Sequence, residues 1–274
     1  MKGLLFYDEI GAKRNAWFIE RLISVSKECG CELQLVVTSD IDAALSACEP
    51  RADLAIVRTI SPQLTESLEK LGIPTFNNAR TATIANDKWL TYLYAKELGV
   101  PVMHTESISE NDSSPSQFTY PLVIKAVDGH GGSEVFLAKN AEECKEILAK
   151  NRNKRFIAQK LSSEPGIDMR VYVLGGEVLK AVCRKSERDF RSNFSLGGKA
   201  EVIPLSKKEA NIVSLISRDL GSDLIGIDFI RHNGEWILNE IEDVVGTRML
   251  YSLTDIDAAE VYIRYIISKL NNTN

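Results

Sequence analysis

Histidine, cysteine and long apolar runs are scarce in this 274-residue chain, and each scarcity excludes a class of protein. The three histidines, His104, His130 and His232, are far apart and form no metal-ligand motif. No apolar run approaches the ~20 residues that a membrane-spanning helix needs, and the apolar stretch near the N-terminus is too short for a signal peptide. The formal net charge is −5, so no excess of Lys and Arg is available to bind nucleic acid or an anionic membrane. We therefore expect neither of these partners.

The five cysteines are odd in number and share no repeated spacing: Cys29, Cys31, Cys48, Cys144 and Cys183. The first two are separated by one residue, which is too close for a structural zinc pair, and no second pair follows. Disulfides are rare in reducing compartments, where such scattered cysteines remain free thiols. The pattern predicts a cytoplasmic protein.

The first eighty residues alternate between strand and helix patterns. Strands are predicted at residues 3–7, 32–38, 53–58 and 73–76, and helices at 16–29, 42–48 and 62–71. This alternation favours a parallel sheet with helices on both faces. Ligands of such sheets bind at the carboxyl ends of the strands, where Arg14 and Arg58 follow two of them. Either arginine could hold an anionic substrate, although a single arginine is more often an ordinary surface residue.

The pattern changes after a long helix predicted at residues 83–98. The polar segment SISENDSSPSQ, residues 107–117, has the composition of a hinge or linker. Hairpins with intervening helices follow it, including one that turns at Asn233-Gly234. A parallel front and an antiparallel back predict an α/β plus α+β protein. With 274 residues, the chain exceeds the ~250 at which single cores stop growing, so we expect two or three units.

Lys125 lies in the middle of an apolar strand, LVIKAV. A buried lysine is costly unless an anion meets it, and a glycine-rich loop, residues 128–133, follows within a few residues. Glycines allow backbone N–H groups to approach a phosphate closely. Each feature also has an ordinary interpretation, since Lys125 could form a structural ion pair and the loop could be a plain hairpin turn.

Three acidic residues, Asp228, Glu240 and Glu242, belong to the last predicted hairpin. Carboxylates that converge in an apolar setting repel one another unless a hard divalent cation such as Mg²⁺ joins them. The alternative is an edge hairpin with solvated acids.

The register of this hairpin raises a geometric objection. A two-residue turn at Asn233-Gly234 would place Asp228 opposite Asn239 and turn Glu240 to the other face. The metal site therefore requires an odd loop length or a bulge near residues 232–235.

Several basic and polar residues lie between these motifs. Arg170 and Arg184 are on the central hairpin, and Arg191 and Asn193 are in the loop that follows it. Guanidinium groups could neutralise an anionic intermediate, and the loop residues could reach phosphate oxygens. Taken alone, each is more often part of an ordinary ion pair or surface.

The order of these motifs resembles the ATP-grasp superfamily. The residues that carry the resemblance are Asp87-Lys88, Lys125 with the GHGGS loop, Gln159-Lys160-Leu161, Asp168-Met169-Arg170, Arg184, Arg191-Ser192-Asn193, Gly226-Ile227-Asp228 and Glu240-Ile241-Glu242. They are most similar to the branch of carboxylate–amine ligases that contains the ribosomal protein S6 glutamate ligase and the carrier-protein ligases of lysine biosynthesis. The resemblance covers roughly residues 77–270, and the first eighty residues fit the domain that usually precedes the ATP-grasp fold.

The resemblance implies four segments and a homo-oligomer, because relatives are usually dimers or tetramers. The segments are an N-terminal pre-ATP-grasp domain (1–82), a connecting helix and linker (83–117), a central lid subdomain (118–161) and a C-terminal subdomain (162–274).

The resemblance also implies a role for each matching residue. For the nucleotide, the implied contacts are Lys88 and Lys125 to phosphates, Gly129, Gly131, Gly132 and Ser133 in the lid, Gln159, Lys160 and Leu161 to adenine, Asp168 to the ribose side, and Arg191 and Ser192 to phosphates. The implied ligands of Mg²⁺ are Asp228, Glu240 and Glu242. The residues near the transferred phosphoryl group would be Arg170, Arg184, Arg191 and Asn193.

By resemblance, the cofactors are ATP and two Mg²⁺ ions, which Mn²⁺ could replace. The reaction would phosphorylate a carboxylate to an acyl phosphate, which an amine then attacks. The substrates would be a small-molecule carboxylate and amine, or a peptide or protein terminus. Two alternatives stay open: a phosphotransferase without an amine acceptor, and a nucleotide-binding regulatory protein without turnover.

The chain departs from the branch at three places. Lys160 stands where the hinge is often acidic, and Glu242 stands where Asn is usual. The segment DVVGTR, residues 243–248, replaces the usual small residue, Pro and Gly. This region helps to shape the acceptor pocket of relatives, so Thr247 and Arg248 are candidates for binding a substrate carboxylate.

Overall fold

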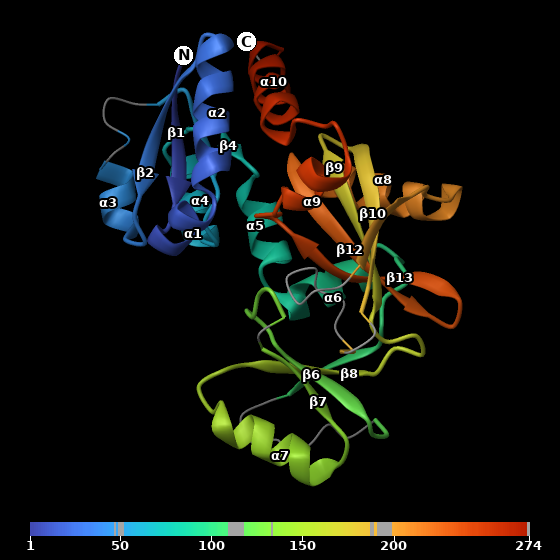
Figure 1. The fold of residues 1–274 in the computed structure, drawn as a ribbon. Coiled ribbons are helices and arrows are strands. Elements are labelled where there is room, and N and C mark those ends of the chain that lie inside the picture. The colour runs from blue at the N-terminus through green and yellow to red at the C-terminus, as the bar shows by residue number, and fades with distance from the viewer. Residues whose placement is uncertain are drawn as a thin grey trace.

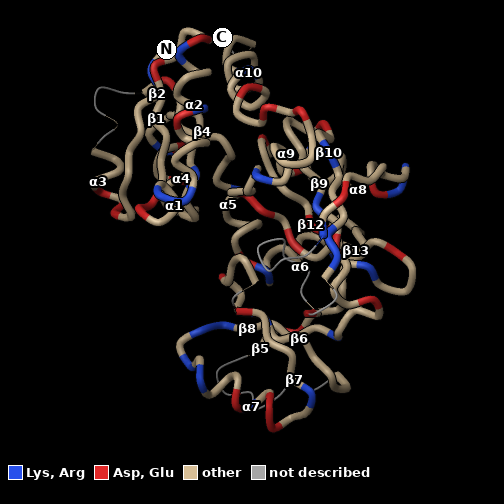
Figure 2. The backbone as a smooth tube through the Cα atoms, in the orientation of Figure 1, with Lys and Arg blue, Asp and Glu red and all other residues tan. Residues whose placement is uncertain are grey.

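The computed structural model describes residues 1–46, 48, 52–108, 118–132, 134–186, 189–190 and 199–272 (Figure 1). Within these residues the strands form three sheets: a parallel sheet A and two antiparallel sheets, B and C. The expectation of a parallel front and an antiparallel back is confirmed. Figure 2 shows that basic and acidic residues are intermixed along the chain, so none of the three parts carries charge of one sign alone.

Sheet A has the strand order β2-β1-β3-β4. Its strands are β1 (Lys2–Tyr7), β2 (Glu32–Val37), β3 (Leu54–Val57) and β4 (Thr75–Phe76), and its helices are α1 (Glu9–Arg14), α2 (Ala16–Glu28), α3 (Ile41–Ser46) and α4 (Pro62–Lys70). The helix α1 lies between the predicted strand at residues 3–7 and the predicted helix at 16–29, where no helix was predicted. The Asp8 side chain caps it by accepting a hydrogen bond from the Gly11 N–H at 2.7 Å.

Two helices stand where one long helix was expected: α5 (Ala79–Ala85) and α6 (Lys88–Glu97). The helix is interrupted at Asn86 and Asp87, where the Asp87 carboxylate accepts a hydrogen bond from the Leu90 N–H at 2.9 Å. An aspartate in this position caps a new helix, which competes with continuation of the old one. The break makes Lys88 the first residue of α6.

Sheet C has the order β5-β8-β6-β7 and is covered by helix α7 (Ala141–Lys150). Its strands are β5 (Thr105–Ile108), β6 (Leu122–Ala126), β7 (Val135–Ala138) and β8 (Phe156–Lys160). Strand β5 lies within residues 83–117, which were expected to be a helix and linker. It pairs with β8 from Thr105 onward, so sheet C includes residues that precede the lid subdomain expected at 118–161.

Sheet B has the order β11-β10-β9-β12-β13. Its strands are β9 (Ile167–Leu174), β10 (Glu177–Lys185), β11 (Lys199–Ile203), β12 (Leu224–His232) and β13 (Glu235–Glu242), and its helices are α8 (Lys207–Leu220), α9 (Arg248–Leu253) and α10 (Ala258–Asn271). Helix α10 packs against α2, which brings the two chain ends together (Figure 1). Sheet B and sheet A thus share one apolar cluster.

The hairpin of β12 and β13 contains the register shift that a metal site required, but the shift lies between Asp228 and Phe229 and not near residues 232–235. Asn233 and Gly234 form a two-residue turn with positive φ angles of 51° and 76°. Asp228 pairs with Glu240 while Phe229 pairs with Leu238, so Asn239 is the extra residue of a β-bulge. The prediction of a bulge near residues 232–235 was therefore wrong in position, because the turn itself is regular.

Candidate active site

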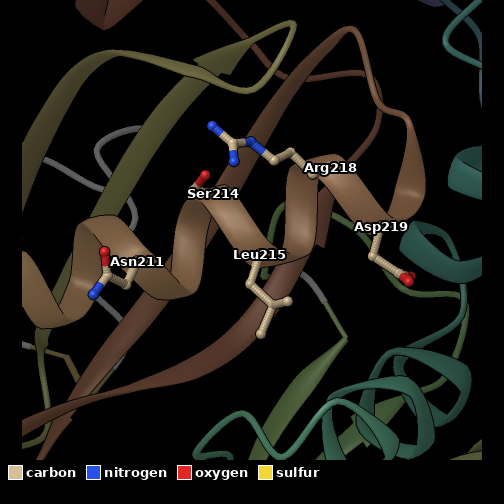
Figure 3. A pocket seen from close by; sticks show the side chains of 5 residues that line it. All are labelled: Asn211, Ser214, Leu215, Arg218 and Asp219. Atoms are coloured by element: carbon tan, nitrogen blue, oxygen red, sulfur yellow. The ribbon is translucent and has the colours of Figure 1, made fainter.

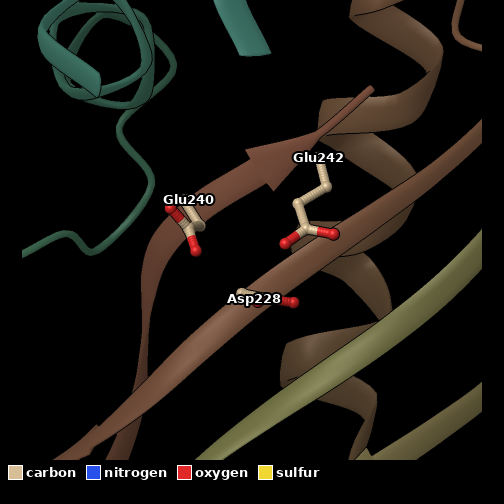
Figure 4. Close-up of side chains that lie close together, drawn as sticks. All are labelled: Asp228, Glu240 and Glu242. Carbon is tan, nitrogen blue, oxygen red and sulfur yellow. The ribbon is translucent and has the colours of Figure 1, made fainter. Parts of the chain in front are cut away.

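Three carboxylates converge at the bulge (Figure 4). Asp228 comes from β12, and Glu240 and Glu242 come from β13, with one oxygen of each lying within 4.8 Å of the others. Asp228 is 1% exposed, and the two glutamates are half-buried. Carboxylate oxygens at this spacing suit a hard divalent cation such as Mg²⁺, which would offset their mutual repulsion.

Two buried arginines bind the same carboxylates from the neighbouring strands. Arg170 on β9 donates to both oxygens of Asp228, at 2.8 and 2.7 Å, and also to Glu242. Arg184 on β10 donates to Asp228 at 2.8 Å and to both oxygens of Asp168, at 2.5 and 2.7 Å. Because β10, β9, β12 and β13 are adjacent, the arginines of β10 and β9 can reach the acids of β9, β12 and β13.

The two acids of this network have opposite pKa shifts. Burial alone would raise the pKa of Asp228, but Arg170 and Arg184 together lower it to about 2. Burial raises the pKa of Glu242 to about 7 against the effect of Arg170, and the charges of Asp228 and Glu240 raise it further. Asp228 is consequently ionised at neutral pH, whereas Glu242 titrates near neutral pH.

Two lysines border the carboxylates on the side of sheet C. Lys125 Nζ donates to the Asn239 side-chain oxygen at 2.8 Å, and Lys88 Nζ lies 3.5 Å from Glu240 Oε2 while donating to the Gly129 carbonyl. Burial lowers the pKa of Lys125 to about 8, with Glu240 opposing and Lys88 adding to the shift. Two ammonium groups beside a carboxylate cluster are suited to phosphate oxygens and their metal ion.

Of the remaining nucleotide candidates, Gly129 contacts Lys88 through its carbonyl. Gly129 is buried, and Gly131 and Gly132 have φ angles of 66° and 76°, which favour glycine. Gln159 on β8 is buried and donates to the Thr105 hydroxyl at 2.8 Å. Lys160 is exposed and Leu161 is half-buried. The candidates outside the described residues are Ser133, Arg191, Ser192 and Asn193.

Asp168 was expected on the ribose side of the nucleotide. In the structure it is buried, and Arg184 binds both of its oxygens. Its position is therefore inside the ion-pair network of sheet B.

The four candidates for substrate binding differ in setting. Arg58 is buried and donates to the Val245 carbonyl at 2.6 Å, and Thr247 is buried at the start of α9. Arg14 and Arg248 are exposed, at the end of α1 and the start of α9. The geometry therefore connects Arg58, and not Arg14, to the chain that follows the carboxylates.

Two asparagines were missed by sequence reasoning. Asn239 is both the bulge and the partner of Lys125. Buried Asn77 donates to Asp243 Oδ1 at 2.7 Å and so holds the start of the loop after Glu242. The available signal for Asn239 was its place directly before Glu240, and that for Asn77 was its place directly after the strand predicted at residues 73–76.

A separate hollow of about 580 Å³ lies on the outer face of α8 (Figure 3). It is lined by Asn211, Ser214, Leu215, Arg218 and Asp219. These are side chains of a single helix surface and do not include the carboxylates or lysines described above, so we do not place the active site there.

Comparison with known proteins decides the family. The model of the RimK-like ATP-grasp domain matches residues 85–266. The chain belongs to this family. Over 98% of its length it is 28% identical to the uncharacterized protein MG011 of Mycoplasma genitalium, of which it covers 93%. It is 27% identical to the glutamate–LysW ligase ArgX of Sulfolobus acidocaldarius, with 79% of this chain and 82% of that protein covered.

The fold of this RimK-like protein is also that of a solved ATP-grasp ligase. The D-alanine–D-alanine ligase of Bacillus anthracis, crystallised with ATP, superposes with a TM-score of 0.81 at 15% identity, over 100% of this chain and 98% of the other. The expected ATP-grasp fold and family are thereby confirmed. ATP-grasp ligases use ATP and divalent metal ions. In the part of the chain that the structure describes, no helix combines the length and apolar character needed to cross a membrane.

Proposed function

We propose that this RimK-like protein is an ADP-forming carboxylate–amine ligase that depends on ATP and Mg²⁺. The observation that carries the proposal is the convergence of Asp228, Glu240 and Glu242 beside Lys88 and Lys125. Relatives named as ligases support the same reaction class. The three carboxylates would hold one or two divalent ions, Mg²⁺ or Mn²⁺. The chemistry that these ions would supply is the withdrawal of negative charge from the phosphate oxygens.

In the first step, an oxygen of the substrate carboxylate attacks the γ-phosphorus of ATP, and the bond from that phosphorus to the bridging oxygen of ADP breaks. Phosphoryl transfer depends mainly on positioning and charge neutralisation. Lys88 and Lys125 supply two positive charges on one side of the carboxylates, and Arg170 supplies a third on the other. Gly129 of the glycine-rich loop contacts these charges, because its carbonyl accepts a hydrogen bond from Lys88.

In the second step, the amine nitrogen attacks the carbonyl carbon of the acyl phosphate. The bond from carbon to the phosphate oxygen breaks, and inorganic phosphate leaves with the proton that the amine loses. Water would compete with the amine for the acyl phosphate, so the site must exclude it. We assign this exclusion to the glycine-rich lid, of which Gly129, Gly131 and Gly132 are described.

For the substrates, we propose an amino acid as one partner, because the similar proteins are named as ligases of glutamate and of D-alanine. The other partner is a small molecule or a peptide or protein terminus. We propose that the nucleotide occupies the space bordered by Lys88, Lys125 and Gln159, and that the protein acts in the cytoplasm as a homo-oligomer. Arg58 is the substrate candidate that the geometry favours.

The test is phosphate release from Mg-ATP, measured against a matrix of carboxylates and amino acids. Release that needs both a carboxylate and an amine supports the ligase. Release with a single carboxylate or hydroxyl compound supports the phosphotransferase instead. Binding of intact ATP without release in any combination, including peptide termini, supports a regulatory protein and contradicts the proposal.

A further inference from the structure

We infer that Tyr7 and Arg58 form a subsite for a carboxylate of the substrate that does not itself react. The subsite deepens the proposed ligase function, on which the identity of its ligand rests. Its ligand is either an amino acid that supplies the amine, held through its carboxylate, or a dicarboxylic acid, held through the carboxylate that is not phosphorylated. The inference depends on the place of these two residues in sheet A, on their burial and on the atoms that lack a partner.

Tyr7 and Arg58 are neighbours at the carboxyl end of sheet A. Phe6 on β1 pairs with Val57 on β3, and the Arg58 N–H donates to the Phe6 carbonyl at 2.9 Å, so the next residues of both strands are adjacent. Side chains alternate along a strand, so these two share the face opposite to Phe6 and Val57. The guanidinium of Arg58 lies 5.7 Å from the ring centre of Phe18, with which Tyr7 shares an apolar cluster.

Each side chain has a buried polar atom without a partner. Tyr7 is 1% exposed and Arg58 is 7% exposed, yet Tyr7 Oη and Arg58 Nε have no hydrogen-bond partner among the described residues. A buried unsatisfied donor is costly, and a buried positive charge is more so. A trapped water would satisfy a donor but would not compensate the charge, whereas a carboxylate would do both.

The protein's own carboxylates do not fill this role within the described residues. Asp243 is near enough for Arg58 to lower its pKa, but its oxygens accept hydrogen bonds from Asn77 at 2.7 Å and from Asn86 at 3.3 Å. Among the described residues Arg58 has no ion pair, and its guanidinium donates a hydrogen bond to the Val245 carbonyl at 2.6 Å. The guanidinium therefore keeps its Nε donor and its charge for a ligand.

The subsite is close enough to the metal-binding carboxylates to serve the same substrate. Val245, which Arg58 contacts, is three residues after Glu242, and three residues of extended chain span at most about 10 Å. Residues 243 and 244 form a turn, so the actual separation is shorter than this limit and suits a substrate of amino-acid size. Because Tyr7 Oη and Arg58 Nε are shielded from solvent, entry requires sheet A and the loop after Glu242 to separate, as closing domains do around substrates.

The experiment measures binding by calorimetry in the presence of Mg-ADP. The probes are the standard L-amino acids, succinate, glutarate and adipate. For each ligand with two carboxylates, two analogues follow, each lacking one of them; for L-glutamate they are 4-aminobutyrate and L-glutamine. A ligand with one carboxylate is compared with its amide. The variants are Arg58→Gln and Tyr7→Phe, and the control is Arg264→Gln, an exposed arginine of α10 that pairs with Glu260.

We expect Arg58→Gln to weaken binding of the ligand at least about tenfold, the loss of one charge-assisted hydrogen bond, without changing the affinity for Mg-ADP. The analogue that lacks the bound carboxylate should be insensitive to Arg58→Gln, which identifies that carboxylate. Tyr7→Phe should weaken binding about three- to tenfold. It should leave the melting temperature unchanged or higher, because it removes an unsatisfied hydroxyl. If the hydroxyl were purely structural, Tyr7→Phe would lower the melting temperature and leave the affinity for the ligand unchanged.

Several outcomes would overturn the subsite. They are the absence of binding by the whole panel, equal affinity in the wild type and a folded Arg58→Gln, and equal losses for the ligand and both analogues. Phosphate release separates this result from the ligase proposal. A ligase whose KM is insensitive to Arg58→Gln would lack the subsite, and Arg58-dependent binding without phosphate release would leave the subsite in place and contradict the ligase.

Discussion

The affinity for Mg²⁺ should depend on pH through Glu242. Burial, with the charges of Asp228 and Glu240, raises its pKa to about 7 in spite of Arg170. A metal ion binds the ionised carboxylate, so it competes with the proton. A group with this pKa is about one-tenth ionised at pH 6 and nine-tenths ionised at pH 8, so the apparent affinity should rise about tenfold, or ~1.4 kcal/mol, between them.

The assay is a calorimetric titration of Mg²⁺ into the protein and ADP at pH 6, 7 and 8. Glu242→Asn is the matched variant, because an amide at this position keeps an oxygen ligand and cannot titrate. The phosphates of ADP titrate in both experiments and cancel in the ratio of the two affinities. The ratio of wild-type to variant affinity should rise about tenfold from pH 6 to pH 8. A constant ratio would refute the argument.

The same shift has a second consequence in the metal-free protein. A carboxyl group whose pKa is raised by folding favours the folded state below its ordinary pKa of 4.5, and this contribution is lost as the pH rises through about 7. Wild-type protein should therefore lose stability relative to Glu242→Asn over this range, as urea denaturation would show. Added Mg²⁺ should reverse the trend, because it binds the ionised form.

Three further substitutions test other parts of the site. Lys125→Ala should weaken Mg-ATP binding at least about tenfold by removing a charged phosphate contact; unchanged affinity in calorimetry would remove Lys125 from the site. Glu240→Ala should abolish phosphate release while circular dichroism shows an intact fold, and retained activity would contradict the three-carboxylate metal site. Arg184→Met should lower the free energy of unfolding in urea by about 3–5 kcal/mol, because it removes the buried arginine that binds both oxygens of Asp168 and one oxygen of Asp228. Lys185→Met, which removes an exposed pair with Glu201, should cost less than about 1 kcal/mol, and similar losses for both would contradict the role of the network.

Much of the fold could be predicted because its signals are local. Alternating strand and helix patterns determined the parallel sheet A, and the Asn233-Gly234 turn determined the hairpin of β12 and β13. The break between α5 and α6 was missed, since apolar periodicity continues through Asn86 and Asp87 and only the capping side chain stops the helix. Strand β5 was missed because its last two residues belong to the polar, proline-containing segment 107–117 and four residues carry little pattern.

The members of the site could be predicted more completely than their connections. The carboxylates were expected together, and the structure places Asp228, Glu240 and Glu242 together. The pairing of Arg184 with Asp168 was not expected, because it depends on the registration of β9 and β10 and on which face each side chain takes. Arg58 was recognised as one of several surface candidates, but its burial and its contact with Val245 depend on packing across 187 residues of sequence.

Asn239 shows why the register objection to the metal site had a solution that the sequence alone did not reveal. A regular hairpin would turn Glu240 away from Asp228, and the extra residue corrects this. The side chain of Asn239 also has a partner, since its oxygen accepts a hydrogen bond from Lys125 on sheet C. One residue thus fixes both the direction of an acid on sheet B and the position of an ammonium group on sheet C. The bulge therefore belongs at Asn239, where it can connect the metal carboxylates to the strand lysine, and a bulge at the turn could do only the first.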